Sequence, residues 1–270
     1  MKIILLCSAQ ANQKALAHKI AANFNLVGVV VEKKKVKSNK LYTFKNIFTK
    51  LSNLIFFRRI TGAWQQMLQF YNMKYDQFPA TKILEVSSIN SADAKLFITD
   101  NQADLVMVSG TSLLKKNILE IQLPVGIINL HTGLSPYIKG SPNCTNWCIA
   151  SRQFHLIGNT IMWIDAGIDS GDLLCTAIVK FTGNESLSDI HIKVMEEAHA
   201  LYLQTVKSMG SNTLQRVKQN SIAAGTTYYS KDWNYKQKRR LLKNMRYFNK
   251  EVNTAEYLNK MASIVTVNIQ

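Results

Sequence analysis

The stretch Gly126–Gly140, which reads GIINLHTGLSPYIKG, decides how the rest of the chain is interpreted. Its first part, Gly126–Leu130, is a short apolar run that follows Pro124 and ends in turn residues. A run of this length predicts a buried strand. Asn129 and His131 lie at its end, two residues apart, so their side chains point to the same face. Two polar groups there indicate a ligand site, because open α/β sheets bind ligands at the carboxyl ends of their strands.

A second stretch, Thr160–Leu174 (TIMWIDAGIDSGDLL), places an acidic turn between two apolar runs. Either Asp165 or Asp169 in this turn would complete a set of side chains with Asn129 and His131. An Asn amide can donate to a developing oxyanion, and an imidazole can move a proton near neutral pH. A carboxylate can hold that imidazole in one tautomer. Each residue alone is more often structural, but the combination favours acyl transfer.

The two stretches together resemble the formyltransferase family, whose members use 10-formyltetrahydrofolate. The matching positions are Asn129, His131, Ser135-Pro136, Lys139-Gly140 and Ile168-Asp169-Ser170-Gly171. The resemblance runs from residue 1 to about 205 and is strongest over 103–174. It implies an α/β, Rossmann-like formyltransferase fold, with a mostly parallel sheet flanked by helices.

The resemblance also implies roles for individual residues. Asn129 and His131 would hold the oxyanion, and Asp169, which matches the family's catalytic aspartate by position, would orient His131 and assist proton removal from an amine. The folate would lie near a group of residues at the end of one strand and in the acidic turn: Met107, Ser109, Gly110, Leu113, Asp165, Gly167 and Ile168. The acceptor would be bound by Lys139, Gly140, Tyr228, Tyr229 and Trp233.

The order of apolar runs predicts the organisation of the chain. Lys2–Leu6, Ala11–Asn23 and Leu26–Val31 form a strand, a helix and a strand, which implies parallel strands and a right-handed crossover. Further strands are expected at Lys82–Val86 and Asp104–Ser109, and as an antiparallel pair at Leu156–Ile164 and Asp172–Phe181. Helices are expected at 92–101, 143–150 and 185–209. We predict a catalytic domain over residues 1–210 and a small basic C-terminal extension over 211–270.

A helical insertion is expected at about residues 33–79. Its first helix carries apolar residues at helical spacing between Phe44 and Ile55, and its second runs through Trp64–Tyr75. A cover over the sheet edge is the favoured interpretation. A membrane-surface helix and a lid over the substrate are the alternatives, since basic flanks and apolar faces suit a membrane surface.

Composition limits the class of protein. The 270 residues are 47% hydrophobic and carry a formal charge of +16. The apolar content suffices for a full core, and no apolar run approaches the roughly 18 residues of a membrane span. The four cysteines show no metal-binding spacing, which predicts a reduced, cytoplasmic protein without a metal site. Cys144 and Cys148, one helical turn apart, are expected to pack in the core.

The acceptor is predicted from the departures from the family. Methionyl-tRNA formyltransferases carry a C-terminal β-barrel, whereas the segment after Gly210 is predicted to be helical and irregular. The first turn, Ser8–Asn12, lacks the glycine-rich phosphate loop of glycinamide ribonucleotide formyltransferases. The residues after His131 look most like the branch that formylates nucleotide-linked amino sugars for surface polysaccharide such as lipopolysaccharide. We therefore expect a nucleotide sugar as acceptor, with methionyl-tRNA and glycinamide ribonucleotide as alternatives.

An interpretation from another class is a non-catalytic RNA-binding or membrane-surface protein on the same fold. About half of the Lys and Arg residues lie in two segments, Lys33–Arg59 and Lys231–Lys250, and basic surfaces attract nucleic acid and anionic lipid. The intact Asn129, His131 and Asp169 set argues against this class. Exposed aromatic residues near the C-terminus would allow a homodimer without requiring one.

Overall fold

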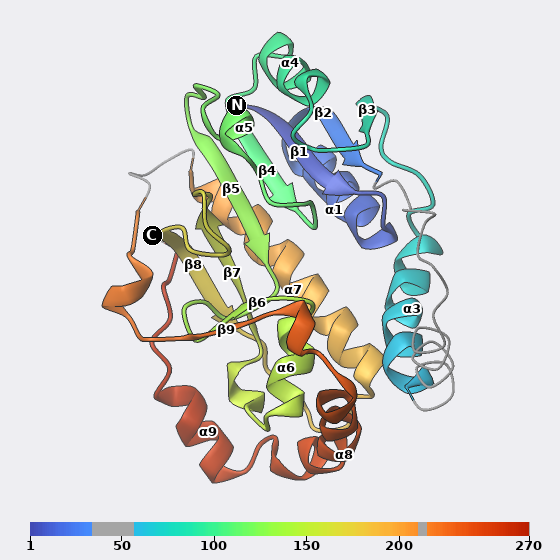
Figure 1. Ribbon diagram of the computed structural model, residues 1–270, viewed down its shortest axis with the longest axis vertical. Helices are drawn as coiled ribbons and strands as arrows, with labels where there is room; N and C mark the ends of the chain where they lie inside the picture. The colour runs from blue at the N-terminus through green and yellow to red at the C-terminus, as the bar shows by residue number, and fades with distance from the viewer. Residues whose placement is uncertain (34–56, 210–214, 270) are drawn as a thin grey trace.

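The computed structural model describes residues 1–33, 57–209 and 215–269. Its main sheet has seven strands in the order β3-β2-β1-β4-β5-β7-β8 (Figure 1). Their bounds are β1 (Lys2–Ser8), β2 (Asn25–Glu32), β3 (Lys82–Val86), β4 (Leu105–Ser109), β5 (Gly126–His131), β7 (Gly158–Trp163) and β8 (Leu173–Ile178). The first five are parallel, and β7 and β8 join as antiparallel strands. The predicted fold class, including the antiparallel pair, is confirmed.

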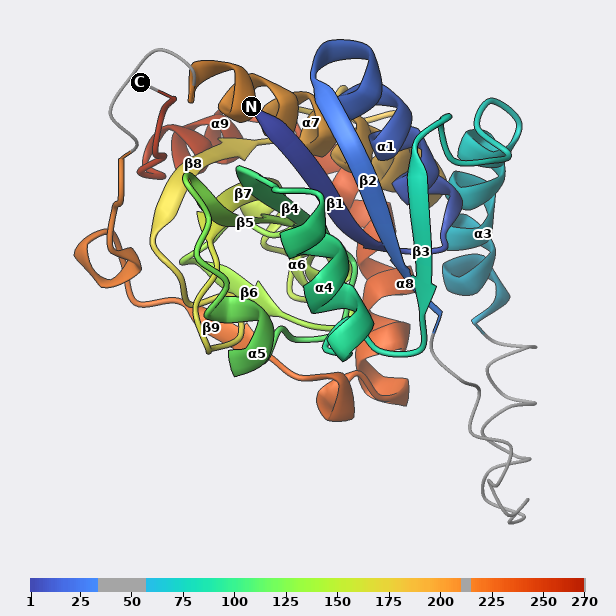
Figure 2. The same cartoon turned by 90° about the horizontal axis from the view of Figure 1, so that it is seen from above.

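Helices cover both faces of this sheet (Figure 2). On one face lie α1 (Ala11–Asn23) and α7 (Leu187–Ser208), whose apolar residues form one core cluster with alternate residues of β1. On the other face lie α4 (Ala92–Asp100) and α5 (Lys116–Leu119), which pack on the intervening residues of β1. Since β1 is buried on both faces, it reads as a continuous apolar run rather than an alternating one.

Helix starts follow the capping residues in the sequence. Ser91 accepts a hydrogen bond from the Ala94 N–H at the start of α4. Asn143 does the same for α6 (Cys144–Ala150), and Ser186 with Asp189 forms a capping box at α7. These local signals explain why the observed starts of α4, α6 and α7 lie within two residues of the predicted ones.

The insertion is described only in its second half. Its helix, α3 (Arg58–Asn72), begins six residues before the expected Trp64 and ends before Tyr75. It packs against α1 and α7 rather than over the edge strand β3, with Met67 and Tyr71 fully buried. The first helix expected in the insertion, between Phe44 and Ile55, lies outside the described residues.

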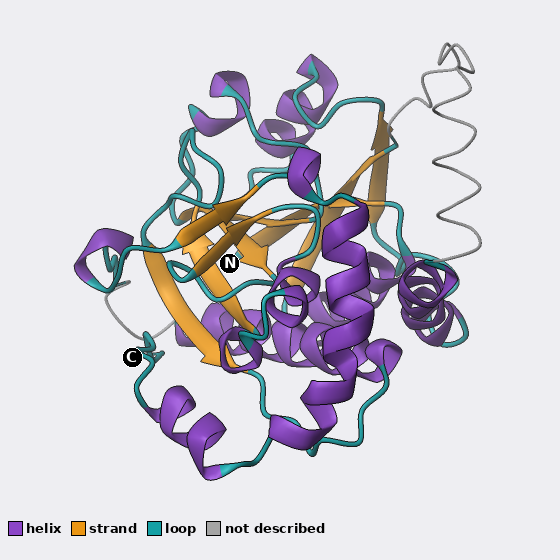
Figure 3. Ribbon diagram, turned by 60° about the horizontal axis from the view of Figure 1, so that its bottom comes forward, coloured by secondary structure: helices purple, strands orange, loops and turns teal. Residues whose placement is uncertain are grey.

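The C-terminal segment is mostly helical, as predicted, with α8 (Tyr235–Glu251) and α9 (Ala255–Ala262). It begins with a short strand, β9 (Thr226–Tyr228), that pairs in parallel with β6 (Ile138–Gly140). Helix α8 lies against α6, where the buried Asn244 amide donates to the carbonyl oxygens of Ile149 and Ala150 at 3.0 and 2.9 Å. Figure 3 brings this part of the molecule forward and shows that helices predominate there. Within the described ranges, no helix is long and apolar enough to cross a membrane.

Candidate active site

A cleft of about 600 Å³ opens at the carboxyl ends of β1, β4 and β5. Its walls are the loop 109–114 after β4, the end of β5 with residues 129–132, and the turn 162–171 between β7 and β8. Parallel pairing sets Val108 opposite Asn129, so the ends of β4 and β5 are side by side. The cleft therefore lies where a parallel sheet is expected to bind its ligand.

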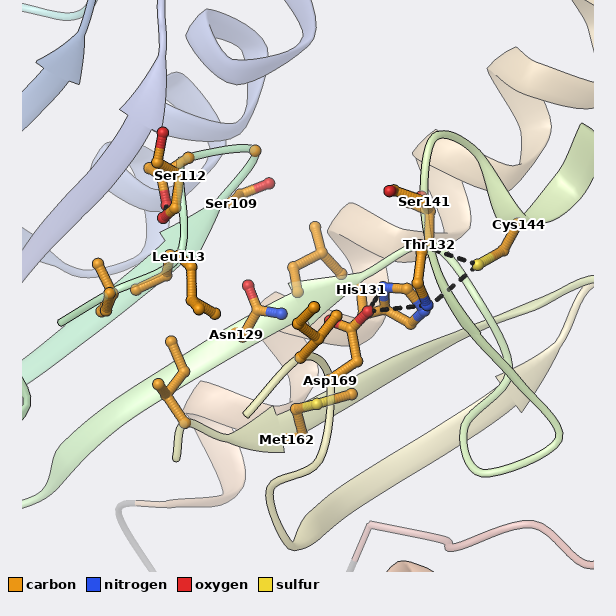
Figure 4. A pocket seen from close by; sticks show the side chains of 18 of the residues that line it. Ser109, Ser112, Leu113, Asn129, His131, Thr132, Ser141, Cys144, Met162 and Asp169 are labelled. Carbon is orange, nitrogen blue, oxygen red and sulfur yellow. Dashed lines mark hydrogen bonds and ion pairs between the residues drawn. The ribbon is translucent and has the colours of Figure 1, made fainter. Parts of the chain in front are cut away.

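His131 and Asp169 form an ion pair in the cleft (Figure 4). The imidazole Nδ1 lies 3.4 Å from the Asp169 Oδ2. The same Oδ2 accepts the Gly140 backbone N–H at 3.1 Å, so the carboxylate is held from two sides. The two side chains are only 10% and 16% exposed, and partial burial weakens the screening that makes surface pairs ineffective. The arrangement fixes the orientation of the ring.

The other ring nitrogen of His131 contacts a cysteine. Cys144 Sγ lies 3.5 Å from His131 Nε2 and 3.5 Å from the carbonyl oxygen of Gly140. Burial, with smaller contributions from Cys148 and Asp169, raises the pKa of the Cys144 thiol well above its usual value. A protonated thiol can donate to Nε2, which fits the tautomer whose Nδ1–H donates to Asp169. Sequence reasoning treated Cys144 as a packing residue, and no spacing rule connects it to His131.

Asn129 completes the predicted set. It comes from the end of β5, two residues before His131, and its amide points into the cleft (Figure 4). Within the described part of the chain, no hydrogen bond engages this amide, so it is available to a ligand. The structure thus brings Asn129, His131 and Asp169 to one cleft, and it places Asp169 rather than Asp165 beside the imidazole.

Six of the seven residues predicted for the folate line the cleft. Ser109 ends β4, Gly110 and Leu113 follow it, and Asp165, Gly167 and Ile168 belong to the turn after β7. Asp165 shapes this turn, because its Oδ1 accepts from the Gly167 N–H at 2.9 Å and from Ser170 Oγ at 2.6 Å. The seventh residue, Met107, is different. Its side chain is fully buried in the core with β1 and α7 and does not line the cleft.

The residues predicted to bind the acceptor lie in different places in the structure. Gly140 lines the cleft, whereas Lys139 lines a separate cavity of about 420 Å³ beside Ser170. Tyr228 stacks on Trp147 with 4.3 Å between ring centroids, and Trp233 meets the same ring edge-on at 4.8 Å. Tyr229, by contrast, is 47% exposed. Trp147 contacts the rings of both Tyr228 and Trp233. It was not predicted as a site residue, because a single Trp in a helix does not indicate which residues it contacts.

Two further residues of the cleft were missed. Asn12 and Gln13, in the first turn of α1, line it and are almost fully buried. Their position just after the carboxyl end of β1 could have identified them, because a helix start beside a strand end faces the ligand edge of the sheet. No group of three or more potential metal ligands occurs among the described residues.

Comparison with known proteins identifies the family of this cleft. A family model described as "Formyl transferase" matches residues 1–206. The methionyl-tRNA formyltransferase of Clostridium perfringens is 34% identical over 116 residues, which are 43% of this chain and 37% of that protein. That of Clostridium botulinum is 32% identical over 127 residues, 47% of this chain and 39% of that protein. These matches span well under half the length of either relative.

Solved structures share the fold at low sequence identity. A 4-N formyltransferase from Francisella tularensis has a TM-score of 0.55 at 19% identity and covers 90% of this chain and 87% of that chain. An N-formyltransferase from Helicobacter canadensis, in complex with folinic acid and dTDP-3-aminofucose, has a TM-score of 0.56 at 13% identity, with 91% and 81% covered. From the match over residues 1–206 and the common fold, we conclude that the chain belongs to the formyl transferase family.

Proposed function

We propose that this protein transfers a formyl group from 10-formyltetrahydrofolate to a primary amine. The observation that carries the proposal is the His131–Asp169 pair beside the free amide of Asn129 in one cleft. This set provides a hydrogen-bond donor for a developing oxyanion and an oriented, charge-bearing imidazole, which are the requirements of acyl transfer. The family to which the chain belongs supports the same reaction.

The cleft fits the folate donor. Leu113 and Ile168 are 52% and 51% exposed, and both line the cleft, from the loop after β4 and from the β7–β8 turn respectively. Exposed apolar side chains on two walls suit a flat heteroaromatic ring such as a pterin. The Helicobacter canadensis enzyme of the same fold is in complex with folinic acid, another formyl-bearing folate. When bound, the donor supplies the formyl carbon that is transferred.

The residues of the chain would then act as follows. Asn129 donates its amide N–H to the formyl oxygen, which gains negative charge as the amine attacks. Asp169 holds the His131 ring through Nδ1 and would stabilise positive charge that develops on the ring during the reaction. Because Nε2 faces Cys144, the amine proton passes toward the Asp169 carboxylate, directly or through one water. The same proton then passes to N10 of the folate as the bond between the formyl carbon and N10 breaks, so that tetrahydrofolate leaves and the formylated amine remains.

For the acceptor we propose a nucleotide-linked amino sugar. Support comes from the sequence after His131 and from the Helicobacter canadensis enzyme, which is in complex with dTDP-3-aminofucose. Tyr229 is exposed and precedes Ser230, whose hydroxyl hydrogen-bonds that of Ser141 in the lining of the cleft at 2.8 Å. An exposed ring at a rim can stack on a base. The second candidate acceptor is methionyl-tRNA, which the names of the curated relatives favour.

A folate-release assay tests both the proposed formyl transfer and the proposed acceptor. The protein is mixed with 10-formyltetrahydrofolate and with nucleotide-linked amino sugars, glycinamide ribonucleotide or methionyl-tRNA in turn. We expect release with a nucleotide sugar, and a loss of about 10²–10³ in rate for Asn129→Ala and for His131→Ala. Asn23→Ala and His18→Ala remove the same side-chain types far from the cleft and should retain the full rate. Full activity in Asn129→Ala would contradict the mechanism, and release with methionyl-tRNA alone would overturn only the acceptor.

A further inference from the structure

A second concave surface lies between α3, the residues just before α7, and α8. It consists of two adjoining cavities of about 660 and 610 Å³ that share Arg59, Ser186, Leu242 and Met245. We call it the α3–α8 groove. None of its lining residues lines the active-site cleft, so the formyl-transfer chemistry does not account for it.

The α3–α8 groove concentrates positive charge without compensation. Its lining includes five cationic side chains, all on exposed residues: Arg58, Arg59, Arg239, Lys243 and Arg246. None of the five forms an ion pair with a described carboxylate, and the sequence has no Asp or Glu at 34–56 or 210–214. A cluster of unpaired like charges is costly for folding and attracts an anionic partner.

The single carboxylate in the groove is already occupied. Glu185 accepts the backbone N–H groups of Thr182 and Gly183 at 2.7 and 2.8 Å, and the Thr182 hydroxyl at 3.0 Å. These bonds hold the Glu185 pKa below its usual value although burial opposes the shift. The Glu185 carboxylate is therefore hydrogen-bonded within its own loop, and no described ion pair joins it to the arginines of the groove.

The cations are arranged along two walls. Arg239, Lys243 and Arg246 follow one another at four and three residues on α8, which places them on one side of the helix over roughly 10 Å. Arg58 and Arg59 lie on the facing wall at the start of α3, followed by the side-chain amides of Gln65, Gln66 and Gln69. Four of the five cations are arginines, whose guanidinium groups bind phosphate oxygens in pairs. This pattern fits a row of phosphates better than a single anion.

A lipid bilayer and a polynucleotide are both anionic, and the shape of the groove distinguishes between them. A bilayer-binding surface needs apolar side chains that insert among the lipids. The apolar side chains that line the groove are buried (Ala63 and Leu187) or partly buried (Leu242 and Met245), and no exposed large hydrophobic residue of the described chain lines it. A flat membrane surface also cannot reach two facing walls at once. We propose that the α3–α8 groove binds the phosphate backbone of a polynucleotide, a function that does not depend on the acceptor of the formyl group.

The test measures binding of fluorescein-labelled uridine and thymidine oligonucleotides of about 20 residues by anisotropy across a salt series. We expect saturable binding whose log–log salt slope reports several phosphate contacts. The variant Arg59→Gln/Arg239→Gln/Arg246→Gln should lose at least tenfold in affinity, and its slope should fall by about 2, since each single-strand contact contributes about 0.7. Comparing the two oligonucleotides distinguishes RNA from DNA as the ligand.

A matched control carries the same loss of charge elsewhere. Lys95→Gln/Lys115→Gln/Lys116→Gln removes three exposed cations at α4 and α5 and should bind as the wild type does. Arg→Lys changes at the three groove positions should keep most of the slope while weakening binding. Melting curves show whether each variant is folded, and single Arg→Gln variants replace the triple one if it is not.

Two results would overturn the proposal. Equal weakening by both Gln triple variants would mean that net charge alone attracts the oligonucleotide. Absence of oligonucleotide binding, with sedimentation on vesicles of phosphatidylcholine and phosphatidylserine in equal parts, would assign the groove to a membrane surface instead.

Discussion

At the scale of single residues, Asp169 and Asp165 occupy one turn but hold different partners. The Asp169 carboxylate accepts from Gly140 and pairs with His131, whereas the Asp165 carboxylate accepts from Gly167 and Ser170 of its own turn. We expect Asp169→Asn to lower kcat by about 10³ with little change in folate KM, because the amide keeps the shape and loses the charge that stabilises the imidazolium. Asp165→Asn should mainly raise folate KM. Steady-state kinetics of the two variants checks this. A kcat loss confined to Asp165→Asn would mean that Asp165, and not Asp169, is the catalytic carboxylate.

The cysteines give a second residue-scale prediction. All four thiols are buried, and burial raises each pKa, to about 11 for Cys175 and further for the others. Since the thiolate is the reactive form, Ellman's reagent at pH 8 should detect almost no fast thiol in the native protein and four after denaturation. A fast native thiol that disappears in Cys144→Ala would show that the residue beside His131 is open to solvent, contrary to the structure.

At the scale of elements, the β6–β9 pair connects the C-terminal segment to the catalytic carboxylate. Gly140 ends β6, pairs with Tyr228 and donates its N–H to Asp169. Its φ is +94°, and an added Cβ would lie 2.0 Å from the Tyr228 carbonyl oxygen. Gly140→Ala should therefore separate the strands, costing about 2 kcal/mol or more of stability and most of the activity. Gly62→Ala, in α3, is the matched control, because a Cβ added there would meet no atom of the described residues outside the helix backbone within 4 Å; it should be neutral or stabilising by up to about 1 kcal/mol.

Chemical denaturation gives the stability of the two glycine variants, and the folate-release assay gives their activity. Full activity in a destabilised Gly140→Ala protein would show that the Gly140 N–H is dispensable for holding Asp169. Loss of stability in Gly62→Ala would show that the added methyl group meets something in α3 that the structure does not place there.

Local signals predicted the elements well and their distant contacts poorly. Strand Lys82–Val86 and the helices at 92–101 and 143–150 were evident because an apolar run or a helical pattern needs only its neighbours in the chain. The pairing of β6 with β9 was not, since three-residue strands carry no periodic pattern and their partners are far apart in sequence. The same reason hid the contact of Cys144 with His131, and the proximity of Asp169 to His131 came from resemblance rather than from spacing.

At the scale of the whole molecule, the free energy of unfolding should fall strongly as the pH is lowered. Helix α7 buries His191 and His199 beside its apolar residues. Burial lowers the pKa of His191 to about 4. Burial, with the nearby Lys19 ammonium, lowers that of His199 to about 3. Both side chains are therefore neutral in the folded protein near neutral pH.

The sign of the effect follows from the unfolded chain, where a histidine has a pKa of about 6.5. Between about pH 3 and 6.5 the unfolded state binds more protons than the folded state, so stability is complete above pH 6.5 and is lost as the pH falls. Each histidine should lower the free energy of unfolding by about 1.4 kcal/mol per pH unit. At pH 4.5 the two together should lower it by roughly 5 kcal/mol. That is a large part of the 5–15 kcal/mol by which a typical domain is stable. Urea titrations from pH 7 to 4.5 measure this slope. His191→Gln and His199→Gln should each flatten it by about 1.4 kcal/mol per unit, and an unchanged slope in both would mean that these rings are protonated within the fold.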